Sequence, residues 1–82
     1  MAKYERSFRG DFNEALSWIH NDIISGSASA SYEDGSDFSS QQTRVAVRVY
    51  ERYSMAGGNR VSLNITLIEE GNMLFLSAIT SR

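Results

Sequence analysis

Residues 44–53, with the sequence RVAVRVYERY, carry the pattern that decides the fold. In the first half of this stretch valine occupies every second position, and arginine holds three of the five even-numbered positions of the whole stretch, at Arg44, Arg48 and Arg52. The alternation returns over residues 60–67, after a segment that contains two adjacent glycines. Successive side chains of a strand point to opposite faces, so each run predicts a strand with one apolar and one polar side. Such strands are typical of an antiparallel sheet that meets water on one face.

We expect the apolar residues of these two strands to share one face of the sheet. That set comprises Val45, Val47, Val49, Val61, Leu63, Ile65 and Leu67. The polar residues between them are then expected on the other face, which includes Arg48, Tyr50, Arg52, Arg60 and Asn64. Arginines interleaved with a tyrosine are one way to bind nucleic acid or another anion. The net charge of -2 favours a solvated face instead, with the arginines paired to glutamates.

A helix is predicted from about residue 12 to residue 24. Asp11 and Glu14 have the spacing of a capping box, in which the first side chain accepts from an amide of the first turn. An apolar stripe at helical spacing supports this interpretation. It comprises Phe12, Ala15, Leu16, Ile19 and Ile23. Gly26 is suited to the left-handed residue that follows a helix end.

Alternation predicts further strands at residues 4–9, 27–33 and 73–80. Residues 33–37 have the composition of a turn, continued by a polar loop to residue 42, and residues 69–72 predict a second turn. The glycines of residues 55–59 precede a strand and not a helix, so they predict a hairpin with positive backbone angles rather than a phosphate loop. We therefore expect one α+β domain over residues 1–82, with one N-terminal helix packed on a mainly antiparallel five-stranded sheet in the order β-α-β-β-β-β.

One helix is too narrow for this sheet. Five strands spaced about 4.8 Å apart span roughly 20 Å, whereas a helix with its side chains is only about 10 Å wide. A large apolar patch left open is unusual on a monomer and typically marks an interface. We therefore expect a homodimer, or another homo-oligomer, that covers the apolar sheet face. Trp18 lies on the helix side opposite the apolar stripe and is a candidate interface anchor.

Composition excludes several classes of function. The chain has no cysteine, so it has no disulfide, thiolate nucleophile or cysteine-ligated metal. No apolar run reaches the roughly 20 residues that span a bilayer, and the mixed charges of residues 4–9 do not form a signal peptide. The acidic groups at residues 33–37 and 69–70 lack metal-ligand spacing and suit solvated turns. We expect a cytoplasmic protein with no membrane contact, no cofactor and no metal.

His20 is the only histidine, and it lies at the flank of the helix stripe. Periodicity places no carboxylate or hydroxyl beside it, so we expect a structural hydrogen bond and not a catalytic role. No convergent set of acid and base groups is visible elsewhere, and the chain is expected not to be an enzyme.

Residues 44–54, 58–64 and 76–81, together with residues 10–12 and 29–36, resemble a family of small uncharacterised bacterial proteins, a domain of unknown function. The likeness covers most of the chain and includes no catalytic motif. It implies a bacterial cytoplasmic protein without an established active site. Members of that family continue into a glycine-rich link and a C-terminal helix, so the resemblance implies that this chain is a shortened form whose missing helix would cover the rest of the sheet.

Three functions remain open on the sequence. The leading hypothesis is a non-enzymatic, self-associating domain that acts through protein–protein contacts. The second is a carrier of a small apolar ligand, with a pocket between helix and sheet lined by Phe12, Leu16, Val47 and Leu63. The third is nucleic-acid or anion binding by the Arg48–Tyr50–Arg52 face, which the acidic net charge makes the weakest of the three.

Overall fold

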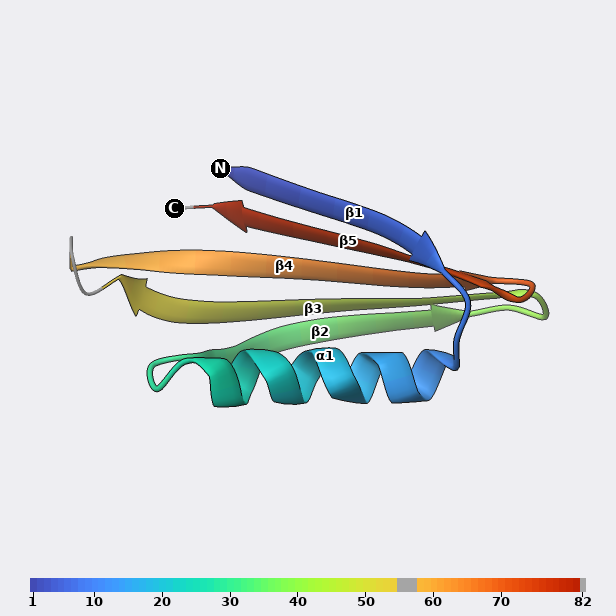
Figure 1. Ribbon diagram of the computed structural model, residues 1–82, viewed down its shortest axis with the longest axis horizontal. Helices are drawn as coiled ribbons and strands as arrows, with labels where there is room; N and C mark the ends of the chain where they lie inside the picture. The colour runs from blue at the N-terminus through green and yellow to red at the C-terminus, as the bar shows by residue number, and fades with distance from the viewer. Residues whose placement is uncertain (55–57, 82) are drawn as a thin grey trace.

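The computed structural model describes residues 1–54 and 58–81 and contains one helix and five strands in the predicted order (Figure 1). The elements are β1 (Ala2–Phe8), α1 (Phe12–Gly26), β2 (Ser31–Ser39), β3 (Thr43–Ser54), β4 (Asn59–Glu70) and β5 (Met73–Ser81). The predicted α+β fold is confirmed. Within the described residues, no helix is both long enough and apolar enough to cross a membrane.

The sheet is antiparallel throughout, with the strand order β1-β5-β4-β3-β2. Strands β2 to β5 form a meander, in which each strand pairs with the next one along the chain. The sheet is completed by β1, which pairs with β5 from Ala2↔Thr80 to Phe8↔Leu74. β4 is therefore the central strand, and β1 and β2 are the two edges.

α1 begins as the sequence predicts and ends differently. The Asp11 carboxylate accepts a hydrogen bond from the Glu14 backbone N–H at 2.9 Å, which confirms the predicted cap. The left-handed conformation predicted for Gly26 is wrong, because Gly26 still belongs to the helix and the chain leaves through extended Ser27. Positive φ angles occur instead in the hairpins, at Gly58 and Gly71, as their turns require. Gly57 lies outside the described residues.

The second strand begins later than predicted. Residues 27–30 connect α1 to β2, and the predicted turn at residues 33–37 lies inside β2. The turn-forming residues are tolerated there because β2 is an edge strand that pairs only with β3 and is mostly exposed. Part of the predicted irregularity survives as a register shift between Tyr32 and Asp34.

The β3–β4 register separates residues that were predicted to share a face. Ser54 pairs with Asn59, which leaves the four residues 55–58 between the strands. Odd-numbered residues of β3 therefore lie opposite even-numbered residues of β4, as in the pair Val47↔Thr66. Residues directly opposite each other in a sheet share a face, and a one-residue shift would exchange the faces. The prediction that the β3 valines share a face with the apolar residues of β4 is wrong.

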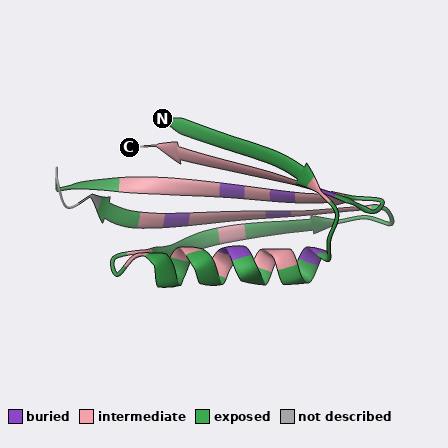
Figure 2. Cartoon of the chain, viewed as in Figure 1, coloured by how far each residue is buried: buried purple, intermediate pink, exposed green. Residues whose placement is uncertain are grey.

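α1 covers only one face of the sheet, which we call the helix face (Figures 1 and 2). Phe12 packs there with Ala46, Leu67 and Leu74, and Ile19 packs with a second cluster. That second cluster contains Tyr50 and Ile65. The apolar helix stripe predicted from the sequence is confirmed, since Ala15, Leu16 and Ile23 also contact these clusters.

We call the opposite side of the sheet the open face, because no helix or strand among residues 1–54 and 58–81 covers it. Besides Tyr53, the pairing registers place eight large apolar residues on this face. They are Phe38, Val45, Val47, Val49, Ile68, Met73, Phe75 and Ile79. Six of the eight are half-buried by their neighbours in the sheet, whereas Phe38 is 62% exposed and Met73 is 39% exposed.

Candidate functional site

The predicted polar face does not exist as one surface. Arg48, Tyr50 and Arg52 lie on the helix face, whereas Arg60 and Asn64 lie on the open face. The cause is the register of β3 and β4, which sets even-numbered residues of the two strands on opposite sides. The hypothesis that these five residues form one surface for nucleic acid is therefore wrong.

Tyr50 is 1% exposed, and its ring packs under α1. Its hydroxyl lies 2.8 Å from His20 Nδ1, so the predicted structural hydrogen bond of His20 is confirmed. Tyr32 of β2 completes an aromatic cluster, with ring centroids 6.0 Å from His20 and 5.7 Å from Tyr50. These contacts fasten the β3 side of the helix to the sheet.

Burial raises the pKa of the Tyr50 phenol above its usual 10.0. The neighbouring Arg48 cation opposes this shift, and Tyr32 adds to it. Tyr50 is therefore a neutral phenol at physiological pH. A buried neutral phenol that is already hydrogen-bonded to a ring nitrogen is suited to holding structure.

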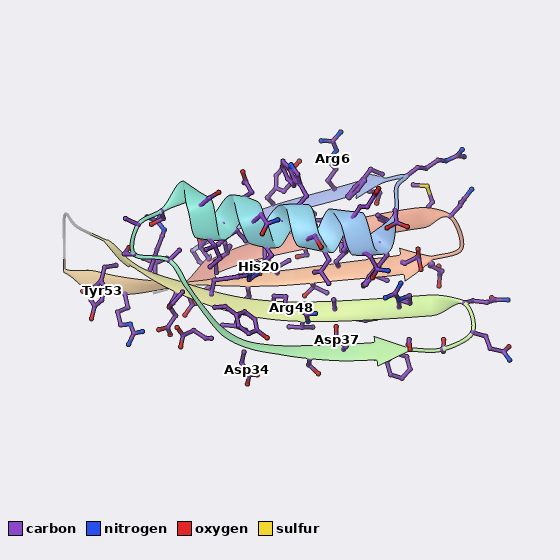
Figure 3. The ribbon with its side chains drawn as sticks, turned by 90° about the horizontal axis from the view of Figure 1, so that it is seen from below. Arg6, His20, Asp34, Asp37, Arg48 and Tyr53 are labelled. Carbon is purple, nitrogen blue, oxygen red and sulfur yellow. The ribbon has the colours of Figure 1, made fainter. Side chains whose placement is uncertain are left out.

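Arg48 is also held within the sheet. Its guanidinium bonds the Asp37 carboxylate at 3.0 Å and the Val47 carbonyl at 2.9 Å, and its side chain is only 18% exposed. Figure 3 shows Arg48 and Asp37 together on the β2–β3 side of α1, and Arg6 on the other side of the helix. Arg48 thus ties the edge strand β2 to β3.

The predicted interface residues also separate into two groups. Val45, Val47 and Val49 lie on the open face, where they are accessible. The four residues predicted from β4 lie on the helix face instead. They are Val61, Leu63, Ile65 and Leu67. Ile65 and Leu67 are 3% and 0% exposed inside the core, so the prediction that they are available to a partner is wrong.

Phe38, Ile68, Phe75 and Ile79 take the place of the β4 residues on the open face. Sequence reasoning missed them as members of this surface. Phe38 falls within the turn and loop that the composition of residues 33–42 predicts, and in the structure it belongs to β2. The other three would have been found by pairing the strands through a four-residue hairpin, which the sequence does not specify on its own.

The open face is mixed: one apolar row crosses the sheet, and the central strand β4 also carries Arg60, Ser62, Asn64 and Thr66 on this face. One row across the sheet is apolar from β5 to β2, through Phe75, Ile68, Val45 and Phe38. The edge strands carry polar residues on this face. They are Lys3, Glu5 and Ser7 on β1, and Asp34 and Ser36 on β2. The apolar row bordered by polar residues is the part of this face that resembles a protein interface, in which a polar rim surrounds an apolar core.

The pocket predicted between helix and sheet is not formed by the predicted residues. Phe12 is 3% exposed in the core, and Val47 lies on the other side of the sheet. A groove of about 570 Å³ is present on the helix face beside α1, where β1 and β5 are uncovered. Trp18 lines this groove and is 68% exposed, which confirms that it faces water in a single copy of the chain.

Comparison with known proteins yields one match. The profile of a family described as "Family of unknown function (DUF6054)" matches residues 1–82. The resemblance to a domain of unknown function is thereby confirmed. No curated protein and no solved structure matches the chain.

Proposed function

The chain belongs over its whole length to the DUF6054 family of unknown function, and we propose that it is a non-enzymatic domain that self-associates through the open face of its sheet. The observation that carries this proposal is an apolar row across the open face, within a larger apolar set of eight residues, left without cover by the described chain. Surfaces of this kind on small domains are typically interfaces.

The area of the open face suits a second copy of the chain. A five-stranded sheet with strands of about nine residues has a face of roughly 20 Å by 30 Å. The flat area of that face is about 600 Å², without the extra area that the protruding side chains add. Two such faces bury about 1,200 Å², which is at the lower end of the range for stable protein interfaces. A partner with a much smaller surface would leave part of the apolar row in water.

The apolar row of the open face can also pack against its own copy. A two-fold axis along the central strand β4 would place β5 of one copy over β3 of the other, so that Phe75 meets Val45. The same operation puts Ile68, and also the polar Thr66 and Asn64 of β4, against their own symmetry mates. At the rim, Lys3 on β1 comes level with Asp34 on β2 of the other copy, which pairs opposite charges. Two sheets packed in this way form a β-sandwich with helices on the outside.

The non-enzymatic part of the proposal is supported by the His20–Tyr50 pair. Among the hydrogen bonds of the described residues, this is the one that joins the histidine to a second titratable side chain. Tyr50 is buried, and its hydroxyl is hydrogen-bonded to the Nδ1 atom of His20. The cluster therefore contributes to packing, and the surface left for function is an apolar one.

The test replaces Val47 by aspartate at the centre of the open face. Val47 points away from α1, so Val47→Asp should keep the circular dichroism spectrum of the wild type. It should also convert a dimer to a monomer, measured by light scattering during size-exclusion chromatography, because a carboxylate would be buried without a partner. Ser17→Asp, on the exposed side of α1, is the matched control and should remain dimeric. A wild-type protein that is monomeric at all concentrations would refute the proposal.

A further inference from the structure

The groove on the helix face is a second apolar surface, separate from the open face. The backbone of α1 lies closest to β4. The helix-face side chains of β1 and β5 are therefore uncovered along one flank of the helix. Tyr4 and Phe8 of β1 and Leu76 of β5 form one wall, and Trp18 of α1 forms part of the other. Its volume of about 570 Å³ lies within the range of small-molecule sites.

The walls of the groove are apolar and aromatic. Tyr4 and Trp18 are 54% and 68% exposed, so two large aromatic side chains on opposite walls face the same water-filled space. Aromatic side chains of this size gain free energy when an apolar group displaces water from them. An apolar ligand chain lying along β1 would contact both walls at once.

The charges of the groove have one sign. Arg6 and Arg9 contribute to its lining, and no carboxylate does. Among the described residues, the ion pairs are Lys3–Glu5, Arg48–Asp37 and Arg60–Glu51, and none of them includes Arg6 or Arg9. Arg6 lies between Tyr4 and Phe8 on the helix face of β1, which places a guanidinium within the apolar wall. Guanidinium groups bind carboxylates by paired, charge-assisted hydrogen bonds.

We propose that this groove binds a small amphiphile with an unbranched apolar chain and a single anionic head, of the class of the medium-chain carboxylates. The apolar chain lies between Trp18 and the β1–β5 wall, and the head is held by Arg6 and Arg9. The groove is on the face of the sheet opposite the proposed dimer contact, so binding does not depend on self-association.

Trp18 is the only tryptophan of the chain and lines the groove, so its fluorescence reports on occupancy. Decanoate, titrated below its critical micelle concentration, should shift the Trp18 emission to shorter wavelength and saturate. Decanol, which has the same chain without the charge, should bind about tenfold more weakly, as should decanoate to the Arg6→Gln/Arg9→Gln variant. The matched control is Arg60→Gln, on the open face, which should bind decanoate like the wild type.

A second variant tests the location of the site. Ala15 lines the groove, and Ala15→Phe should fill it and abolish saturable binding, followed by calorimetry, while the helical circular dichroism signal is retained. Three results would overturn the proposal. They are equal affinity for decanoate and decanol, decanoate binding that survives in Arg6→Gln/Arg9→Gln, and an emission shift that occurs only with anionic lipid vesicles, which would identify a membrane surface as the ligand.

Discussion

Tyr50 shows most clearly how one residue changes its role between sequence and structure. In the sequence it alternates with valines and stands among arginines, which indicates a wet position. In the structure it is 1% exposed, because α1 crosses above it and His20 accepts or donates the hydrogen bond that its hydroxyl needs. A buried hydroxyl is tolerated only when it has such a partner. His20 and Tyr50 therefore stabilise the fold as a pair.

Removing the Tyr50 hydroxyl should change stability in two ways. Tyr50→Phe leaves His20 Nδ1 without its partner, and we expect a loss of about 1 kcal/mol in the free energy of unfolding at neutral pH. The folded pKa of Tyr50 is raised, so wild-type stability is fully present below pH 10.0 and declines as the pH rises from there through the folded pKa. Tyr50→Phe should make this decline shallower in urea titrations at a series of pH values.

The control for this prediction is Tyr53→Phe. Tyr53 is 54% exposed and lies on the open face at the far end of β3, so its replacement removes a phenol without exposing a buried partner. It should keep both the neutral-pH stability and the alkaline decline of the wild type. A Tyr50→Phe protein that loses stability with pH as steeply as the wild type would contradict the assignment of the decline to Tyr50.

At the scale of elements, β3 contributes side chains to both the open face and the core. Its odd-numbered residues give the valines of the open face, and its even-numbered residues give Ala46 and Tyr50 to the core. Arg44 and Arg48 also lie on the helix face, where the Arg44 guanidinium covers the Phe12 ring at 4.2 Å and Arg48 pairs with Asp37. Arginine stems of this kind line the border of an apolar core.

The start of α1 depends on one side chain. Asp11→Ala removes the carboxylate that accepts from the Glu14 N–H, and it should lower the free energy of unfolding by about 1 kcal/mol in urea denaturation. Asp11→Asn keeps an oxygen acceptor and should retain most of the stability. Asp22→Ala, in the exposed third turn of the same helix, serves as the control for loss of a carboxylate. Equal losses for Asp11→Ala and Asp22→Ala would show that the cap makes no specific contribution.

At the scale of the whole molecule, the single helix divides the apolar surface into three parts. The first is the core between α1 and the sheet, the second is the open face, and the third is the groove beside Trp18. The sheet is too wide for one helix, as its strand number alone predicts. The two uncovered parts are on opposite sides of the molecule, so each proposed role can be tested without disturbing the other.

The proposed two-fold axis makes a charge prediction for the assembled particle. Lys3→Glu would set a carboxylate level with Asp34 of the other copy and should weaken the dimer, seen as a higher dissociation constant in sedimentation equilibrium. Adding Asp34→Lys restores opposite charges and should recover most of the affinity. The effect should shrink at high salt, because both residues lie on exposed edges. A double variant no tighter than Lys3→Glu alone would exclude this axis and leave other dimer geometries in place.

The sequence by itself determined the number, type and order of the elements. Local periodicity is enough for that, because the alternation of residues 44–53, the stripe of α1 and the Asp11 cap each depend on neighbours in the chain. β2 was misplaced because its stability comes from pairing with β3, which outweighs its turn composition. Strand pairing depends on distant residues, and local patterns do not report it.

Only the tertiary structure decided which residues share a surface. One extra residue in a hairpin exchanges the two faces of a strand, so the register of β3 against β4 sent the valines to the open face and Ile65 and Leu67 to the core. The groove likewise required the position of α1 over β4, since Trp18 and Tyr4 are brought together only by packing. The hydrophobic effect favours the burial of any apolar area and is not directional. The strand register and the position of the helix therefore determine which apolar side chains are buried.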